Sequence, residues 1–165
     1  MSKLTVVGSI NADLIVHAER HPQPGETLLG SGGDILAGGK GANQAVAAAQ
    51  LGATVAFVGA VGSDSYAEPA MHYMRTSGID LGTVEQADTN TGLAVITVSA
   101  DGENTIVISP GANALVDAPF VTSRASTIAD AHVVLLQGEI PASGFQAAVE
   151  AAQGRVVVNL APVVA

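Results

Sequence analysis

The chain alternates short valine-rich apolar runs with alanine-rich segments of helical length. Four almost wholly apolar runs predict buried strands, and they span residues 4–7, 54–58, 132–138 and 155–160. Helices are predicted between them, over residues 43–51, 65–77, 117–129 and 143–153. Because strands that alternate with helices pair in parallel through crossover connections, the pattern predicts an α/β fold with a mostly parallel sheet and helices on both faces.

Some of these helices carry recognisable start and stop signals. Glycines follow three of them and act as C-terminal stops, at positions 52, 78 and 154. Ser65 and Glu68 have the spacing of a capping box, which predicts that a helix begins at Ser65. Asp64, directly before that helix, is interpreted as a helix-terminal charge rather than a catalytic group.

Two segments depart from this alternation. Residues 14–17 and 28–36 have weak strand character and are separated by the turn-forming sequence HPQPGET. Residues 91–109 hold two strand-like runs around Asp101-Gly102, which is a strong hairpin signal. Threonine and serine alternate there with apolar residues, which places one face of this hairpin in solvent, outside the main sheet.

Composition and charge exclude several classes of function. Fifteen acidic residues against six basic ones give a formal charge of −9, which disfavours nucleic acid and anionic membrane surfaces as partners. There is no cysteine, so disulfides and thiolate metal sites are excluded, and the four histidines show no metal-binding spacing. No run has the length of a membrane span or a signal peptide, and a cytoplasmic protein is therefore expected.

The glycine-rich stretch AGGKGANQAV, which opens the first helix, invites comparison with phosphate-binding loops. A P-loop requires G-x-x-x-x-G-K-[ST], but Asp34 takes the first glycine position and Gly41 takes the place of the hydroxyl residue. The dinucleotide pattern G-x-G-x-x-G begins at Gly39 and Gly41 but meets Gln44 at its third glycine. The stretch therefore matches neither phosphate-binding motif.

Polar residues gather where the predicted strands end. Asn11 and Asp13 follow the first strand, and Glu139 follows the strand 132–138. The carboxyl ends of parallel strands share one edge of a sheet, so these side chains should meet the glycine loop there. The loop would add Lys40 and Asn43. A site that mixes donors and acceptors suits a polyhydroxylated ligand such as a sugar, while the other reading of the loop is a turn needed only for tight packing.

Several longer motifs together resemble the N-terminal part of the ribokinase-like (PfkB) carbohydrate kinases. The resemblance rests on VVGSINADLIV, PQPGET, AGGKGANQAVAAAQLGA, FVGAVGSD, PGAN, QGEIP and NLAP, and it covers essentially the whole chain. It implies a three-layer, Rossmann-like domain, of which residues 1–165 are the N-terminal portion, with a β lid made of segments 14–36 and 91–109. In ribose-phosphorylating members the lid also mediates dimerisation, so a homodimer is expected.

The resemblance also implies an activity and a site. The activity is ATP-dependent phosphorylation of D-ribose at its 5-hydroxyl, with Mg²⁺ and a monovalent cation such as K⁺ as the implied cofactors. Asn11 and Asp13 would bind ribose hydroxyls, with Asp13 accepting from two of them. The other sugar-binding positions implied are Gly39, Lys40, Asn43 and Glu139. No metal ligand and no nucleotide-binding residue is assigned within the chain.

One family motif is absent. The catalytic aspartate of the family lies in a G-A-G-D sequence, which does not occur between Met1 and Ala165. The chain alone is therefore expected to be inactive, and the reaction would need a C-terminal half. Two alternatives stay open: a related kinase for fructose or a nucleoside, and a non-catalytic sugar-binding or assembly module.

Overall fold

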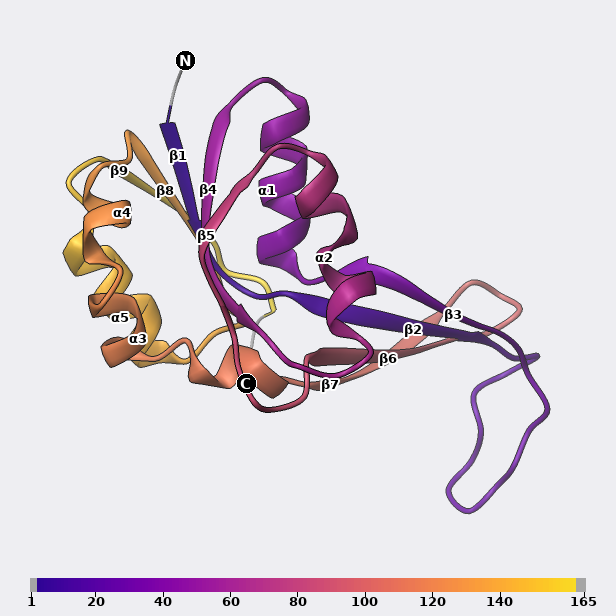
Figure 1. Cartoon of the computed structure of the whole chain (residues 1–165). Coiled ribbons are helices and arrows are strands. Elements are labelled where there is room, and N and C mark those ends of the chain that lie inside the picture. The colour runs from indigo at the N-terminus through magenta and orange to yellow at the C-terminus, as the bar shows by residue number, and fades with distance from the viewer. Residues whose placement is uncertain (1–2, 163–165) are drawn as a thin grey trace.

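The computed structural model describes residues 3–162, which form two sheets and two helical layers (Figure 1). The strands are β1 (Lys3–Val7), β2 (Asn11–His17), β3 (Ser31–Gly38), β4 (Thr54–Val61), β5 (Asp80–Gln86), β6 (Gly92–Val98), β7 (Asn104–Ser109), β8 (Val133–Gln137) and β9 (Arg155–Asn159). The helices are α1 (Lys40–Gln50), α2 (Ala67–Thr76), α3 (Ala118–Thr122), α4 (Ala125–Ala129) and α5 (Ala142–Ala151), with a 3₁₀ helix η1 (Gly111–Leu115).

The main sheet has five strands in the order β5-β4-β1-β8-β9, and every neighbouring pair is parallel. The predicted mostly parallel α/β sheet is confirmed. β1 and β8 lie side by side in the centre, with Val7 opposite Leu136. The segments that follow these two strands, from Gly8 and from Gly138, consequently leave the sheet at the same edge.

The three predicted layers are present. Helices α1 and α2 cover one face of the main sheet, and α3, α4 and α5 cover the other (Figure 1). Successive strand residues point to opposite faces, so Val6 packs in the core beneath α1 and α2 while Val7 packs in the core beneath α3 to α5. Both valines are fully buried.

The second sheet has four strands in the order β3-β2-β6-β7 and extends away from the main sheet (Figure 1). It contains both segments predicted to lie outside the main sheet, although β2 begins at Asn11 and β3 runs to Gly38, beyond the predicted bounds. The hairpin predicted around Asp101-Gly102 is formed by β6 and β7, which pair antiparallel. β2 and β6 pair in parallel at the centre of this sheet.

The predicted capping box at the start of α2 is wrong. The helix begins at Ala67, and Ser65 makes no capping bond; Asp64 instead accepts a hydrogen bond from the Tyr66 amide at 3.2 Å. Glu68 pairs with Arg75 on the exposed face of the helix, at 2.7 Å, rather than turning back to the helix start. A charged acceptor already at the helix terminus replaces the weaker serine hydroxyl.

Asp64 also joins the two sheets. Its carboxylate accepts from the Thr91 hydroxyl at 2.6 Å and from the Thr91 amide at 3.0 Å, just before β6 begins. Burial alone would raise the pKa of Asp64, but these bonds and those from the start of α2 outweigh it and hold the pKa below its ordinary value. Asp64 is therefore a structural charge, as the sequence suggested, with a second partner that the sequence did not reveal.

Two further elements differ from the predictions. The predicted helix 117–129 is split into α3 and α4, because the Arg124 amide donates to Val121, three residues back, and tightens the turn at 3.0 Å. Strand β5 was not predicted, since its sequence DLGTVEQ mixes charged residues with a glycine. It lies at the sheet edge and pairs only with β4 among the described strands.

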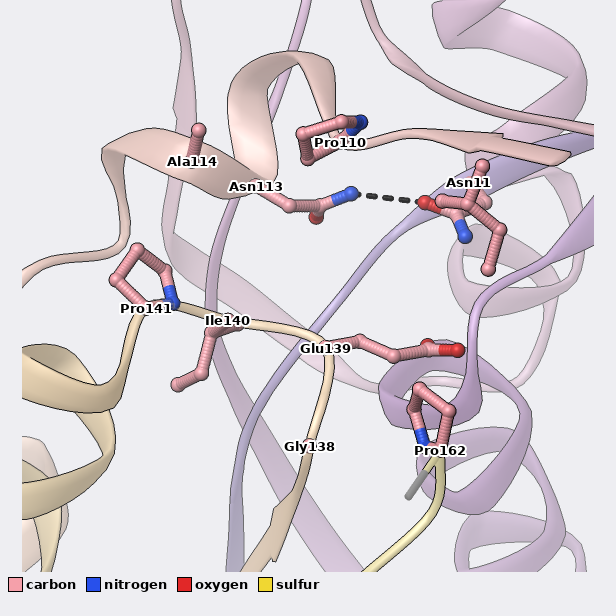
Figure 2. A pocket seen from close by; sticks show the side chains of 10 residues that line it. Asn11, Pro110, Asn113, Ala114, Gly138, Glu139, Ile140, Pro141 and Pro162 are labelled. Carbon is pink, nitrogen blue, oxygen red and sulfur yellow. Dashed lines mark hydrogen bonds between the residues drawn. The ribbon is translucent and has the colours of Figure 1, made fainter. Parts of the chain in front are cut away.

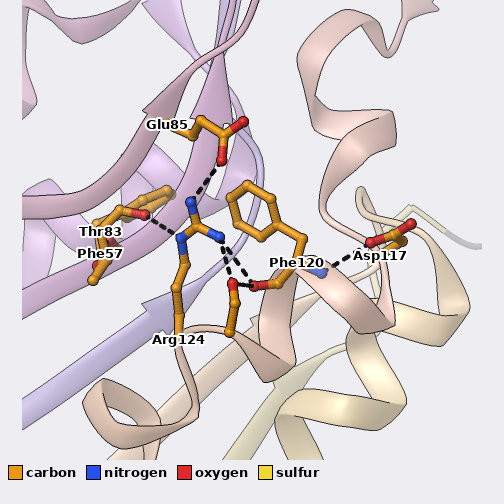
Figure 3. A network of polar contacts seen from close by, with 7 residues as sticks. Phe57, Thr83, Glu85, Asp117, Phe120 and Arg124 are labelled. Atoms are coloured by element: carbon orange, nitrogen blue, oxygen red, sulfur yellow. Dashed lines mark hydrogen bonds and ion pairs between the residues drawn. The ribbon is translucent and has the colours of Figure 1, made fainter.

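Arg124 fastens this edge strand to the helical layer (Figure 3). Its Nε donates to the Thr83 carbonyl at 3.1 Å, and its Nη2 contacts the Glu85 carboxylate at 2.7 Å. The guanidinium also lies over the Phe120 ring, 3.6 Å from the ring centre. One side chain thus supplies hydrogen bonds and a cation–π contact between β5 and α3.

Arg124→Ala is expected to lower the free energy of unfolding by about 1–3 kcal/mol, because it leaves a part-buried carbonyl without its donor. Urea denaturation of the full gene product that contains residues 1–165 measures this loss. The matched control is Arg75→Ala, which removes an exposed ion pair and should cost under about 0.5 kcal/mol. Equal losses in the two variants would contradict the structural role of Arg124.

Candidate functional site

The six residues singled out as sugar ligands lie around one cavity of about 110 Å³. They come from the start of β2, the start of α1 and the segment after β8, which the topology brings to the same edge of the main sheet. The lining residues are Asn11, Asp13, Gly39, Lys40, Asn43 and Glu139, with Ala94, Ile96, Ile106 and Ile108 from the second sheet. Their predicted convergence is confirmed, whereas their roles as ligands stay predictions.

Glu139 occupies the amino terminus of helix α1. Its Oε2 accepts from the Lys40 amide at 2.8 Å, and its Oε1 accepts from the Lys40 ammonium at 2.7 Å. Burial by itself raises the pKa of Glu139, but the hydrogen bonds from Lys40 and Ser9 outweigh it, so the pKa lies below its ordinary value. A helix amino terminus attracts anions, and here a carboxylate of the chain itself fills that position.

This arrangement gives the physical reason why the glycine loop matches no phosphate motif. The Lys40 amide is taken by Glu139, the Gly41 amide donates to the Ser9 hydroxyl at 3.3 Å, and the Ala42 amide donates to the Ser9 carbonyl at 3.0 Å. Hydrogen-bond donors that would cradle a phosphate are thus already satisfied. The glycines serve close packing instead, because a Cβ on Gly41 would lie 2.6 Å from the Ser9 nitrogen.

Ser9 is a site residue that the sequence reasoning missed. Its hydroxyl donates to Glu139 Oε2 at 2.6 Å while it accepts from the Gly41 amide. The residue is fully buried between the end of β1 and the start of α1. Its position two residues before Asn11 in the sequence SINAD was the available signal, but a small hydroxyl residue in a turn carries no distinctive pattern.

Asp13 presents a carboxylate to the cavity that has no hydrogen-bond partner among residues 3–162. Burial is the main cause that raises its pKa, the nearby charge of Glu139 adds to the effect, and Lys40 opposes it. The carboxylate lies directly over Gly38 on the neighbouring strand, where a Cβ would stand 2.1–2.3 Å from the Asp13 carboxyl atoms. Asp13 therefore has free acceptor capacity in a partly desolvated place, which favours ligands that bring hydroxyl donors.

Asn11 lies between this cavity and a larger one of about 340 Å³ (Figure 2). The larger cavity is mostly apolar, with Ile108, Pro110, Ile140 and other nonpolar side chains in its wall. Figure 2 shows the Asn11 amide oxygen turned toward Asn113, which donates to it at 2.8 Å. Asn113 was not predicted as a site residue, although the motif PGAN that contains it was noticed.

The second sheet supplies the apolar wall of the smaller cavity. Ala94 pairs with Ile108 and Ile96 pairs with Ile106 across β6 and β7, so these four side chains share one face. The same face includes Asp13, which is opposite Ala94 on β2. The cavity thus places one unpartnered carboxylate against an apolar wall, a pairing suited to a ring with polar edges and a nonpolar face.

Among residues 3–162, no three histidine, aspartate or glutamate side chains are grouped so that they could hold a metal ion. Within the same range, no helix is long and apolar enough to cross a membrane.

Comparison with known proteins places this site in a family. The model of the pfkB family of carbohydrate kinases matches residues 1–164. A ribokinase from Haemophilus influenzae is 44% identical over 165 residues, an alignment that covers 96% of this chain and 53% of the relative. A ribokinase from Bacillus subtilis is 40% identical over 142 residues, an alignment that covers 86% of this chain and 48% of the relative.

Solved structures agree with this assignment. A ribokinase from Thermotoga maritima superposes with a TM-score of 0.91 at 32% identity, covering 99% of this chain and 54% of that one. A ribokinase from Arabidopsis thaliana, solved with ribose and ATP, has a TM-score of 0.87 at 36% identity. The superposition covers 98% of this chain and 54% of that one. The chain spans about half the length of these relatives. Its sequence motifs, its three-layer fold and the family match over residues 1–164 together show that the chain belongs to the pfkB family of carbohydrate kinases.

Proposed function

We propose that this chain supplies the sugar-binding half of an enzyme that transfers the γ-phosphoryl group of ATP to the 5-hydroxyl of D-ribose. The observation that carries the proposal is the convergence of all six predicted ligands around one cavity, with the Asp13 carboxylate free to accept hydrogen bonds. The relative from Arabidopsis thaliana that was solved with ribose and ATP supports the choice of sugar and nucleotide.

Each residue of the cavity has a chemical task in this proposal. Asp13 accepts hydrogen bonds from two ribose hydroxyls, and Asn11, on the same face of β2, contacts a neighbouring hydroxyl. Lys40 and Asn43 hold the sugar from the side of α1. Glu139 acts mainly through Lys40, because its carboxylate already accepts three hydrogen bonds from Ser9 and Lys40. The isoleucines of the second sheet cover the ring and exclude water.

The described residues do not fit the phosphates of ATP. Lys40 is the one cationic side chain that lines either cavity, and it is paired with Glu139, which also occupies the amino terminus of α1. We therefore derive no step of phosphoryl transfer through this chain. The proposal assigns ATP, its Mg²⁺ and any K⁺ to the part of the family fold that the longer relatives have and this chain does not span.

The test of the proposed function is ribose-dependent ADP release by the full gene product that contains residues 1–165, with ATP and Mg²⁺ supplied. Fructose and a nucleoside serve as competing substrates, because both remain open within the family. Preferred turnover of ribose supports the proposal. Preferred turnover of fructose or the nucleoside would show that the enzyme is a related kinase of the family with a different substrate. No turnover at all would overturn the assignment as a kinase.

Asp13→Ala is expected to weaken ribose binding by about 1–3 kcal/mol, equivalent to a roughly 5- to 150-fold loss, because the hydroxyls lose a charged acceptor. Calorimetric titration of the full gene product with ribose measures this change, and circular dichroism checks that the variant folds. Unchanged KM and kcat for ribose would contradict the role of Asp13.

Gly38→Ala provides a second, independent perturbation of the same carboxylate. The added methyl group would collide with the Asp13 carboxylate and push this flexible side chain out of the cavity, although residue 13 itself stays an aspartate. Ribose binding should therefore fall as it does in Asp13→Ala, while the double variant should lose little more than either single one. Additive losses would show that Gly38 acts on some other feature.

The second sheet is also our proposed dimerisation surface. Val95 and Val107 pair on the face that points away from the cavity and are 39% and 72% exposed, so a second copy of the chain could cover them. Val107→Lys should shift the full gene product from dimer to monomer in sedimentation.

A cytoplasmic location remains part of the proposal, in keeping with the acidic, cysteine-free composition.

A further inference from the structure

Asn113 is a buried amide whose every polar atom is engaged. The residue, in η1, is 2% exposed. Its Oδ1 accepts from the Ile10 amide at 2.8 Å, while its Nδ2 donates to the Ile10 carbonyl at 3.1 Å and to Asn11 Oδ1 at 2.8 Å. Asn113 and the backbone of Ile10 thus form a closed pair of hydrogen bonds, with Asn11 as a third partner.

The backbone of Ile10 fixes which way both amides point. A backbone N–H can only donate and a carbonyl can only accept, so Asn113 must turn its oxygen to the Ile10 nitrogen and its NH₂ to the Ile10 carbonyl. The second hydrogen of that NH₂ then faces Asn11, and the amide oxygen of Asn11 must turn toward it to accept the hydrogen bond. The orientation of the Asn11 amide is therefore set by main-chain chemistry rather than by a choice between two equivalent rotamers.

Asn11 and Asn113 pack closely over Gly92, and the hydrogen bond from Asn113 holds the Asn11 oxygen on that side. A Cβ added to Gly92 would lie 2.2 Å from Asn11 Oδ1 and 2.2 Å from Asn113 Nδ2, so the pair of amides fills the space above that glycine. Asn11 is 3% exposed, yet it lines both cavities. In Figure 2 its amide nitrogen lies on the side turned away from Asn113, and it has no hydrogen-bond partner among residues 3–162.

We propose that Asn113 is a positioning residue that fixes Asn11 as an obligate hydrogen-bond donor to the sugar site. The two neighbouring ligands on β2 then have opposite demands: Asn11 requires a lone pair on the ligand, whereas Asp13 requires a hydrogen. This fixed polarity selects the direction of each hydrogen bond to the sugar hydroxyls. The inference rests on the proposed function and adds to it the polarity of one subsite.

Fluorinated and deoxygenated sugars test directly whether Asn11 donates a hydrogen bond to the sugar or accepts one from it. Fluorine keeps an acceptor lone pair but carries no hydrogen, whereas the deoxy sugar offers neither. The experiment measures, for the full gene product, the affinity ratio of the fluoro to the deoxy analogue at the 1-, 2- and 3-positions of ribose. At the position that faces Asn11, we expect the wild-type protein to prefer the fluoro analogue by about 3- to 10-fold, the range of one neutral hydrogen bond.

Two variants separate polarity from general damage. In Asn11→Asp, one carboxylate oxygen still accepts from Asn113 and the other faces the sugar, so the fluoro-to-deoxy ratio at that position should fall below 1. In Asn113→Ala the amide of Asn11 is released and the ratio should fall to about 1. Asn104→Ala, in the exposed strand β7, is the matched control and should keep the wild-type ratio. Thermal melting shows whether each variant is folded. If Asn113→Ala does not fold, the comparison of Asn11→Asp with wild type still tests the proposal.

The two proposals fail differently. Absence of ribose binding and turnover in the wild-type protein overturns the proposed function. Ribose binding with a fluoro-to-deoxy ratio that is the same in wild type and Asn11→Asp overturns the polarity inference alone.

The orientation can also be measured without any sugar. In ¹⁵N-labelled protein the side-chain amide protons of Asn113 should exchange slowly with solvent, because both are bonded internally, while those of Asn11 exchange fast. Fast exchange at Asn113 would overturn the inference irrespective of the substrate.

Discussion

Glu139→Ala should cost the protein about 1.5–3 kcal/mol of unfolding free energy, the range of hydrogen bonds to a charged group, because Lys40 is 37% exposed and the ion pair is only part-buried. The Glu139 side chain is only 7% exposed and accepts hydrogen bonds from the Ser9 hydroxyl and from both the amide and the ammonium of Lys40. Its loss leaves three donors without their acceptor at the start of α1. Because Lys40 and Asn43 lie on the first turn of that helix, ribose affinity should fall with stability. Urea denaturation and calorimetry on the same preparation measure the two effects.

The matched control is Glu150→Ala, at the exposed surface of α5, where Gln146 is the one hydrogen-bond partner of the carboxylate among residues 3–162 and a change under about 0.5 kcal/mol is expected. Acid provides a second check. Since the folded-state pKa of Glu139 lies below the ordinary value of 4.5, its stabilising effect is fully present above pH 4.5 and is lost as the pH falls through the folded-state pKa. The stability gap between wild type and Glu139→Gln should be widest near neutrality and should close in acid. A gap that is independent of pH would contradict the assignment.

Gly144→Ala is expected to destabilise the protein by about 3 kcal/mol or more, the upper end of what overpacking costs. A Cβ at this position would lie 1.9 Å from the carbonyl oxygen of Val116, which is backbone and cannot rotate aside. Helix α5 would have to lift from α3, its neighbour in the helical layer, and expose part of the core that contains Val116 and Ala148. Urea denaturation, together with the yield of soluble protein, measures the effect.

Ser143→Ala tests the same helix one residue earlier. Ser143 is exposed, and alanine is the better helix former, so this variant should be as stable as wild type or slightly more stable. If both variants lost similar amounts of stability, the helix itself, rather than its contact with Val116, would be the sensitive feature.

The main features of the fold could be predicted because local sequence and tertiary structure agree there. The runs at residues 54–58 and 132–138 are apolar on both faces, as buried parallel strands require, and they lie in β4 and β8. Asp101-Gly102 identified the hairpin, since Gly102 adopts a φ of 86° that glycine tolerates readily. A rule of topology, that parallel strands end at one edge of the sheet, predicted that Asn11, Asp13 and Glu139 would meet the glycine loop, whereas the set of six sugar ligands came from the family resemblance and stays a prediction.

The remaining features depend on partners far away in the sequence. Strand β5 has a weak sequence pattern and is held in part by Arg124. This arginine donates to the carboxylate of Glu85 in β5, although the two residues are 39 positions apart in the sequence. The turn that splits the helix 117–129 is stabilised by the same arginine, through its bonds to the Phe120 carbonyl and the Ser123 hydroxyl. Local spacing favoured Ser65 as a cap because it could not reveal that Asp64 also has Thr91 to hold it in place.

The same distance effect explains why Glu139 was predicted as a ligand and not as a cap. A carboxylate after a buried strand resembles a binding residue in sequence, and only the folded structure shows that its oxygens are already bonded. Asn113 was overlooked because it lies 102 residues from Asn11 in the sequence, and only the folded chain brings its amide against the Ile10 backbone and the Asn11 oxygen.

The carboxylate at the start of α1 has a consequence for the order of folding. Glu139 is 99 residues away from the helix that it caps, and its strand reaches the sheet only after most of the described chain has been made. A contact of such long range forms late, because the entropy of closing the loop must be offset first. The cavity proposed to bind the sugar is therefore completed only when β8 has docked beside β1, so that an intermediate lacking this strand holds Lys40 in no fixed position. Ligand binding in this protein should report on a finished sheet, and ribose should slow unfolding more than it speeds refolding.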